Sequence, residues 1–357
     1  MTGYERIKNV LSHQPVDRIP VFEHFWRDTK EEYINKGYIK PDETMEDHFG
    51  FDMQEFWPFK MVADLDYEPE VIAETETTIT RLDGNGAKLK YHKTNVTTPE
   101  HVGFTVTDRE SWEKYKKFLV NIDERRINFE GYRKAKEAAK KANRFFVWSG
   151  INVFECMHPI CGHENMLMGM ILDPEWIEDM VDTYATLTVE LQKILFEREG
   201  LPDGIWYYED MGFKDKPFMS PEMYCNLIMP GHKKTIDYAK SLGLPVIMHS
   251  CGYVRPLLPH MIEAGIDCLQ ALEVKAGMDL LEIHKTFGDK IAIMGGIDVR
   301  ALYSNDKAVI DKELESKIPA VKNGYGFVLH SDHSIPKTVE YEMYKYFIKK
   351  GIELGTY

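Results

Sequence analysis

Residues 245–252 of this 357-residue chain are Pro-Val-Ile-Met-His-Ser-Cys-Gly, an apolar run that ends in a histidine and a cysteine two positions apart. The run is typical of a buried β-strand, and a strand directs residues i and i+2 to the same face. His249 and Cys251 can therefore converge on one ion, while Gly252 lets the chain turn away. Because histidine nitrogen and cysteine sulfur are preferred ligands of Zn²⁺, we expect a zinc site at the end of this strand.

This strand belongs to a series in which short apolar segments alternate with amphipathic ones. The amphipathic stretches lie at 174–197, 221–242, 254–264 and 309–322. The apolar segments predict strands at 145–150, 204–210, 245–251, 268–273, 290–297 and 326–330. Two earlier candidates, 19–25 and 51–56, bring the total to eight, which is the number that closes a (β/α)₈ TIM barrel. We therefore predict an α/β fold of this type.

Residues 68–107 interrupt the alternation. Two β-prone stretches, 74–81 and 87–92, lie on either side of the turn sequence Asp-Gly-Asn-Gly at 83–86. This pattern predicts an antiparallel β-hairpin. Because no core-sized stretch accompanies it, we interpret 68–107 as an insertion near the barrel, within one domain that spans residues 1–357.

Composition narrows the class of protein. A hydrophobic content of 43% and a charged content of 29% are typical of a globular protein, and no apolar run is long enough to cross a membrane. The first residues lack the apolar core of a secretory signal, so we expect a cytoplasmic protein whose five cysteines are reduced. The net charge of −14 disfavours nucleic acid as a partner. The oligomeric state stays open, a homodimer included.

Polar side chains gather where the predicted strands end, which is where catalytic groups lie in such barrels. In chain order they are Glu23, His24, Trp26, Arg27, Glu55, Trp57, Glu155, His158, Glu209, Asp210, His249, Cys251, Gln270, Glu273, Lys275, Asp298, His330, Asp332 and His333. Some have a structural alternative: Asp298 is equally typical of a helix cap, and Glu23 or Glu55 can form an ion pair with Arg27 or a lysine. Catalytic zinc usually has three protein ligands, so Asp332 and His333 are candidates for the third.

Several segments resemble one known family over essentially the whole chain. They are Arg6-Ile-Lys-Asn-Val-Leu-Ser-His, Asp17-Arg-Ile-Pro-Val, Leu172-Asp-Pro-Glu, Met294-Gly-Gly-Ile-Asp-Val and Ser334-Ile-Pro. All are similar to segments of the uroporphyrinogen decarboxylase superfamily, which includes the zinc-dependent, corrinoid-linked methyltransferases. The resemblance implies the same barrel fold.

The site motifs divide this superfamily. True uroporphyrinogen decarboxylases carry an Arg-Gln-Ala-Gly-Arg loop that binds substrate carboxylates, whereas this chain has His24-Phe-Trp-Arg-Asp-Thr, with one arginine. The methylcobamide:coenzyme M methyltransferases carry His-x-Cys-Gly and, later, a second cysteine before Gly-Ile-Pro. This chain has His249-Ser-Cys-Gly, but His333 stands where the second cysteine would be. The decarboxylases also have a histidine there, so this position does not discriminate.

The resemblance implies a zinc-dependent methyltransferase that moves a methyl group between a small methylated substrate (an ether, thioether or amine) and the cobalt of a separate corrinoid protein, as in anaerobic O-demethylation. His249, Cys251 and either His333 or Asp332 would hold the zinc. Glu209, Asp210 or Glu155 would protonate the leaving group or orient a metal ligand. We expect the substrate and the corrinoid (cobalamin) to contact Trp26, Arg27, Trp57, Tyr207, Gln270, Glu273 and Asp298.

Two alternatives remain open at this point. One is a metal-independent lyase of the decarboxylase type, in which Asp210 or another carboxylate stabilises a protonated pyrrole. The other is a non-catalytic protein that binds a corrinoid or another tetrapyrrole. Zinc content separates both alternatives from the methyltransferase.

Overall fold

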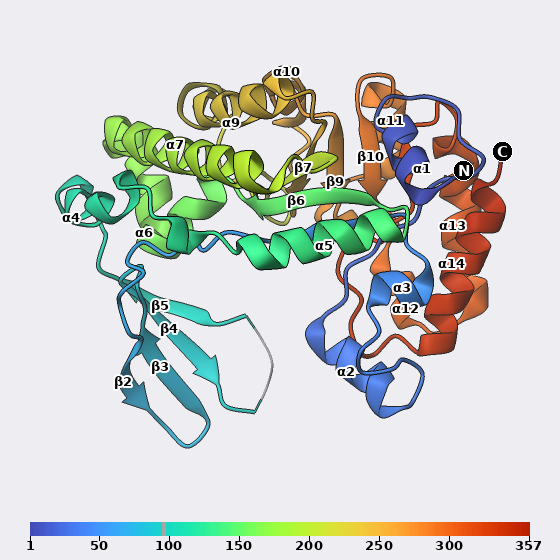
Figure 1. Ribbon diagram of the computed structural model, residues 1–357, viewed down its shortest axis with the longest axis horizontal. Coiled ribbons are helices and arrows are strands. Elements are labelled where there is room, and N and C mark those ends of the chain that lie inside the picture. Colours follow the sequence, from blue (N-terminus) through green and yellow to red (C-terminus); the bar gives the residue numbers. More distant parts are fainter. Residues whose placement is uncertain (95–97) are drawn as a thin grey trace.

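A parallel sheet forms the centre of the computed structural model, which describes residues 1–94 and 98–357 (Figure 1). In spatial order its seven strands are β1 (Met53–Phe56), β6 (Phe145–Ile151), β7 (Gly204–Tyr208), β8 (Val246–Ser250), β9 (Cys268–Ala271), β10 (Ala292–Gly295) and β11 (Phe327–Val328). Each strand is parallel to its neighbours. Most residues of β6 to β11 are buried, as expected for a parallel sheet that is covered on its outer face.

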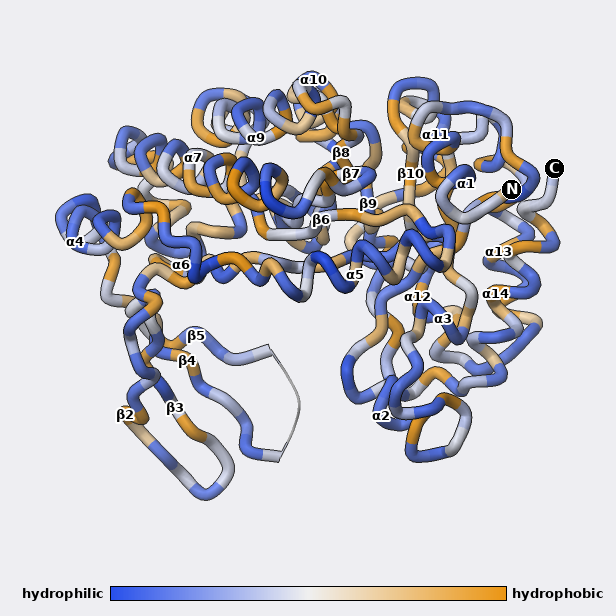
Figure 2. The backbone as a smooth tube through the Cα atoms, viewed as in Figure 1, coloured by the Kyte–Doolittle hydropathy of each residue, from blue (hydrophilic) through white to orange (hydrophobic). Residues whose placement is uncertain are grey.

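Helices connect the strands and pack around the sheet (Figure 1). They are α1 (Gly3–Val10), α2 (Arg27–Asn35), α3 (Met45–Phe49), α4 (Arg109–Val120), α5 (Phe129–Lys141), α6 (Val153–Leu172), α7 (Pro174–Glu199), α8 (Pro221–Met223), α9 (Met229–Ser241), α10 (Leu258–Ala264), α11 (Leu280–Phe287), α12 (Val299–Tyr303), α13 (Lys307–Val321) and α14 (Tyr341–Gly355). Figure 2 shows that α5 is largely hydrophilic; it buries Tyr132 and Ala139 and exposes most of its lysines. In the described residues, no helix combines the length and apolar character that a membrane crossing requires.

The predicted first strand, 19–25, differs from expectation. It forms isolated bridges, Val21 with Leu329 and Phe25 with Ile335, and no continuous ladder. Its backbone still contacts both edges of the sheet, because Val21 O accepts from Asp52 N at 2.9 Å and Pro20 O accepts from Leu329 N at 2.9 Å. Pro20 has no N–H to extend the pairing. The described sheet is thus a curled, seven-stranded open sheet, and the prediction of an eight-stranded closed barrel is corrected accordingly.

A second sheet lies beside the main body, below α4 and α6 in Figure 1. It has four antiparallel strands in chain order, β2 (Glu70–Glu74), β3 (Thr78–Leu82), β4 (Ala87–His92) and β5 (Glu100–Phe104). The predicted hairpin is its central pair, and its turn is closed by the bond from Gly86 N to Asp83 O at 2.9 Å. Phe104 packs against Gly162 of α6, which attaches this sheet to the parallel one.

Candidate metal-binding active site

Three potential metal ligands converge at the ends of β7 and β8. They are Asp210, His249 and Cys251, and one ligand atom from each lies within 4.8 Å of the others. His249 Nε2 is 3.1 Å from Asp210 Oδ1 and 3.3 Å from Cys251 Sγ. The two neighbouring strands bring Asp210 beside the pair that the sequence predicts. This set of one nitrogen, one sulfur and one oxygen suits Zn²⁺.

Charge interactions bind the three side chains to one another. Burial opposes a charge on His249, but Cys251 and Asp210 beside it raise its pKa well above the ordinary value. Burial likewise opposes a charge on Asp210, yet His249 lowers the pKa of this carboxyl to about 2. Burial raises the pKa of the Cys251 thiol despite the nearby His249. The cluster therefore favours a cation at its centre, which a metal ion would supply in place of the imidazole proton.

Two glycines set the position of Cys251. Gly252 has φ +76°, and a Cβ at this residue would overlap the backbone of Gly212, so the two loops touch backbone to backbone. Tyr253 N donates to Phe213 O at 2.7 Å, which joins the same loops. Cys251 N in turn donates to Asp210 Oδ1 at 2.8 Å. A side chain at either glycine would therefore push apart the loops that carry Asp210 and Cys251.

A cavity of about 490 Å³ opens beside these ligands. Its lining combines acids, bases and aromatic rings: Thr98, Glu155, His158, His163, Asp210, Gly212, Phe213, Lys214, Phe218, Cys251, Gly252, Glu273, Lys275 and Ala276. Glu155 Oε1 lies 2.8 Å from His158 Nε2, and burial raises the pKa of Glu155 although His158 opposes this. A carboxyl that holds its proton more tightly than an ordinary glutamate therefore lies in the same cavity as the three potential metal ligands.

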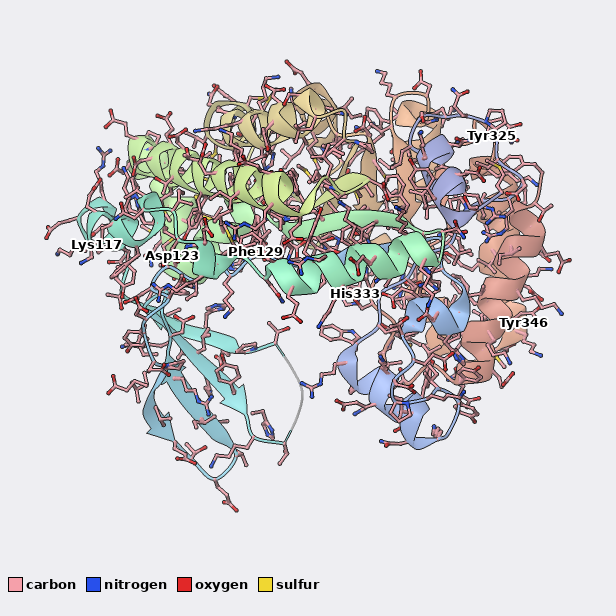
Figure 3. The ribbon with its side chains drawn as sticks, in the orientation of Figure 1. Lys117, Asp123, Phe129, Tyr325, His333 and Tyr346 are labelled. Atoms are coloured by element: carbon pink, nitrogen blue, oxygen red, sulfur yellow. The ribbon has the colours of Figure 1, made fainter. Side chains whose placement is uncertain are left out.

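Asp332 and His333, the two predicted candidates for the third ligand, lie outside this group of three. Both Asp332 oxygens accept backbone N–H groups, from Val274 and Val299, each at 2.8 Å. The Asp332 side chain is thus occupied in joining two loops. His333, labelled in Figure 3, packs against Trp26, with the ring centroids 6.0 Å apart. Asp210, rather than Asp332 or His333, lies beside His249 and Cys251.

Two further predicted site residues, Tyr207 on β7 and Glu209 directly after it, point away from the cavity. Glu209 is fully buried and accepts from Phe154 N at 3.0 Å and Glu155 N at 2.6 Å, at the beginning of α6. Tyr207 faces the helices, where its hydroxyl lies 3.2 Å from Gln192 Nε2. Because adjacent strand residues alternate, Tyr208 instead faces inward, with its ring centroid 4.8 Å from that of His249.

The remaining predicted binding residues are dispersed. Trp26 and Trp57 are 40% and 44% exposed, so both are accessible to a partner. Arg27 pairs with Glu31 at 2.9 Å on the exposed surface of α2. Asp298 caps α12 and pairs with Arg300, which is the structural alternative foreseen for it.

Glu273 and Gln270 hold the metal-ligand loops from the β9 side. Glu273 Oε2 accepts from Gly252 N at 2.8 Å, and its other oxygen pairs with Lys275 at 3.1 Å. Gln270 Oε1 contacts His249 Nδ1 in a short hydrogen bond. Glu273 also lines the cavity.

A buried polar network extends from Gln270 across the inside of the sheet. Gln270 Nε2 is 3.5 Å from His330 Nε2, which is 3.1 Å from His24 Nδ1. His24 Nε2 is 3.0 Å from Glu55 Oε1, and Glu55 Oε2 accepts from Tyr208 OH at 3.0 Å. The strand-end pattern indicated most of these residues individually. Tyr208 was missed because the apolar run 205–208 gives no sign of which face each residue takes.

Comparison with known proteins identifies the family and agrees with the fold. The family model described as uroporphyrinogen decarboxylase (URO-D) matches residues 80–353. The methylated-thiol–coenzyme M methyltransferase of Methanosarcina mazei is 27% identical over 146 residues, which are 41% of this chain and 37% of that protein. The uroporphyrinogen decarboxylase of Carboxydothermus hydrogenoformans is 28% identical over 138 residues, or 39% of this chain and 38% of that protein. The matches thus span less than two fifths of either relative.

A solved structure described as a methyltransferase from Methanosarcina mazei has the same fold. It superposes with a TM-score of 0.69 at 17% identity and covers 99% of both chains. At this identity the likeness concerns the fold alone. This likeness in fold spans nearly the whole length of this chain.

Proposed function

The chain belongs to the uroporphyrinogen decarboxylase family, and from this premise we propose that it is a zinc-dependent methyltransferase. It moves a methyl group between a small methylated substrate (an ether, thioether or amine) and the cobalt of a separate corrinoid protein. The observation that carries the proposal is the convergence of Asp210, His249 and Cys251 beside an open cavity. The similarity to the Methanosarcina mazei methyltransferase supports the same class of reaction.

The donor set fits a catalytic zinc site. Three protein ligands are usual for such sites, and the cavity beside them leaves access for a substrate atom. Bound zinc would act as a Lewis acid that stabilises negative charge on the substrate heteroatom as the methyl group leaves. Cys251 and Asp210 together would balance the charge of the ion.

Other residues of the cavity would bind the substrate and hold a proton for it. Phe213 and Phe218, with ring centroids 5.7 Å apart, offer an apolar wall for the substrate. Glu155 lies beside Asp210, since Asp210 N donates to Glu155 Oε2 at 3.4 Å, and it bonds His158 on its other oxygen. These contacts support Glu155 as the acid that protonates the leaving heteroatom. The exposed rings of Trp26 and Trp57 offer contact surface to the corrinoid protein.

Metal analysis tests the site. We expect about one zinc per chain in the purified, metal-replete protein, and loss of that zinc in Cys251→Ala and in Asp210→Ala. Cys225→Ala is the matched control. Cys225 lies on the helical segment Tyr224–Ile228 and is not one of the three proposed ligands, so this substitution should leave the zinc content unchanged. A zinc-free wild-type protein that is indistinguishable from Cys251→Ser would contradict the proposal.

Turnover is tested with free cob(I)alamin as the methyl acceptor and a panel of methyl ethers, thioethers and methylamines. Formation of methylcobalamin is followed by absorbance, with Cys251→Ala as the inactive control. Zinc binding without transfer from any donor would favour a non-catalytic corrinoid-binding protein. The lyase of the decarboxylase type is a second candidate, because decarboxylases are among the similar proteins. Consumption of uroporphyrinogen by zinc-free protein would support it.

A further inference from the structure

The two nitrogens of His249 have different partners. Nε2 faces Asp210 Oδ1 and Cys251 Sγ, whereas Nδ1 contacts Gln270 Oε1. His249 and Gln270 are directly paired in the register of β8 and β9, so the parallel sheet itself holds them side by side. Gln270 is 1% exposed, and water cannot readily replace it as the partner of Nδ1.

The chemistry of the amide oxygen determines which nitrogen carries the proton. An amide oxygen can only accept a hydrogen bond, so Nδ1 of a metal-bound His249 must be protonated and donate to it. The lone pair is then on Nε2, which faces the other two ligands. We propose that Gln270 is a positioning residue that fixes the tautomer and the ring orientation of His249 for metal binding. This inference rests on the proposed metal site.

The network behind Gln270 keeps its amide in this orientation. His330 Nδ1 contacts Ser331 O, an acceptor, so Nδ1 carries the proton and His330 Nε2 must accept. His330 Nε2 therefore favours the amide nitrogen of Gln270 on its side and leaves the amide oxygen to His249. A rotated amide would place its N–H groups against the Nδ1–H of His249 and its oxygen against the accepting Nε2 of His330. Both hydrogen bonds of Gln270 would then be lost.

Anchors at the far end hold the network in place. Ser331 N donates to Glu23 Oε2 at 2.9 Å, which fixes the chain that carries His330. His24 bonds both His330 and Glu55, and Trp57 Nε1 donates to Glu55 Oε2 at 3.1 Å. The orientation of the His249 imidazole thus depends, through Gln270 and His330, on a chain of hydrogen bonds that ends at Glu55 and Trp57 near β1.

The chain offers a matched control in Gln192. This glutamine is also completely buried, and its amide lies beside the Tyr207 hydroxyl between the sheet and α7. Gln192→Leu removes a buried glutamine without touching the metal-ligand cluster. It therefore separates loss of packing from loss of the bond to His249.

The test replaces zinc with Co²⁺ and compares wild type with Gln270→Leu, Gln270→Glu and Gln192→Leu. Loss of an outer partner of a metal-binding histidine typically lowers metal affinity about 10- to 100-fold. We expect this loss for Gln270→Leu, together with loss of the exchangeable, cobalt-shifted proton NMR signal of the His249 Nδ1–H. Gln270→Glu keeps an acceptor and should keep both affinity and signal, as should Gln192→Leu.

The outcomes separate the two proposals. Unchanged affinity and an unchanged shifted proton in Gln270→Leu would overturn the positioning role and leave the metal site standing. A wild-type protein that binds no Co²⁺, or whose binding is unaffected by Cys251→Ser, would overturn the metal site and the positioning role together. Should Gln270→Leu not fold, rapid solvent exchange of the shifted proton in wild type would overturn the positioning role by itself.

Discussion

Asp210 and Asp332 both follow strands of the parallel sheet, but their carboxylates have different surroundings. The Asp210 side chain is 42% exposed and faces His249, whereas Asp332 is 2% exposed and accepts two backbone N–H groups. We expect Asp210→Asn to lower zinc affinity at least tenfold with little loss of stability. Asp332→Asn should lower the free energy of unfolding by about 2 kcal/mol, because one of two buried acceptors is lost.

Zinc titration and urea unfolding of both variants check this prediction. Asn at either position preserves the size of the side chain, so each variant serves as the control for the other. A larger loss of zinc affinity in Asp332→Asn than in Asp210→Asn would show that the assignment of the third ligand is wrong.

Glu23 is the residue whose protonation should affect stability most clearly. Burial raises the pKa of Glu23 from an ordinary value near 4.5 to about 8. Between these values the folded protein holds a proton that the unfolded chain releases, so the free energy of unfolding falls as pH rises from about 4.5 to 8. The loss amounts to roughly 5 kcal/mol, at about 1.4 kcal/mol per pH unit.

Glu23→Gln cannot titrate and should lose this part of the pH dependence. Urea unfolding of wild type and Glu23→Gln at pH 5 and pH 8, in the presence of a chelator, measures the difference between them. Other groups titrate equally in both proteins, so their contributions cancel. Parallel pH profiles for the two proteins would contradict the prediction.

The loop that follows β8 depends on one glycine. Gly252 and Gly243 have nearly the same φ, +76° and +73°, but a Cβ at Gly243 has nothing within 4 Å, whereas one at Gly252 would meet Gly212. Gly243→Ala should therefore cost only the backbone strain of about 1–2 kcal/mol and retain zinc. Gly252→Ala should cost more and also lose zinc, because Cys251 is displaced.

Thermal unfolding and zinc content of the two variants distinguish strain from displacement. Both substitutions add the same side chain at nearly the same φ, so the backbone strain is similar in the two variants. A difference between them therefore reports the contact between the loops. Equal stability and equal zinc content in the two variants would show that contact between the loops does not place Cys251.

The strands themselves could be predicted from the sequence wherever a continuous apolar run lies between helical segments. The predicted ranges 145–150 and 268–273 correspond to Phe145–Ile151 and Cys268–Ala271. The side of the sheet to which each residue of such a run points could not be predicted. Burial on both sides removes the polar alternation that identifies a face. For this reason the sequence does not distinguish the outward Tyr207 from the inward Tyr208.

The carboxylate that we propose as the third metal ligand could not be predicted from the sequence for a different reason. Asp210 and Asp332 are both carboxylates at strand ends, and only the packing of loops decides which one lies near His249. The pair His249 and Cys251 could be foreseen because two residues on one strand share a face regardless of the rest of the fold.

Residues 18–22 lie between the two edge strands of the sheet, β1 and β11, and Asp52, directly before β1, binds this segment. Asp52 is 2% exposed; it pairs with Arg18 at 2.8 Å and Arg6 at 3.1 Å and accepts from Val21 N at 2.7 Å. Removing one partner from a buried ion pair leaves an uncompensated charge and typically costs about 3–5 kcal/mol. We expect Asp52→Ala to lower the free energy of unfolding by this amount.

Urea unfolding measures the effect, and Glu110→Ala is the control. Glu110 pairs with Lys114 on the exposed surface of α4, where such a pair contributes less than about 1 kcal/mol. Hydrogen exchange should localise the loss in Asp52→Ala to β1 and β11. Similar stability of the two variants would indicate that the meeting of these edges contributes little to the fold.

All three proposed metal donors come from the ends of two adjacent strands, β7 and β8. Residues 209–219 and 249–253 therefore form a compact cassette whose host must supply a parallel strand pair in the same register and, on the next strand, a partner for His249 Nδ1 such as Gln270. Such a cassette could be transplanted into a metal-free relative, or erased from this one, without rebuilding the scaffold. Gain and loss of metal chemistry within one lineage would then require the exchange of two short loops.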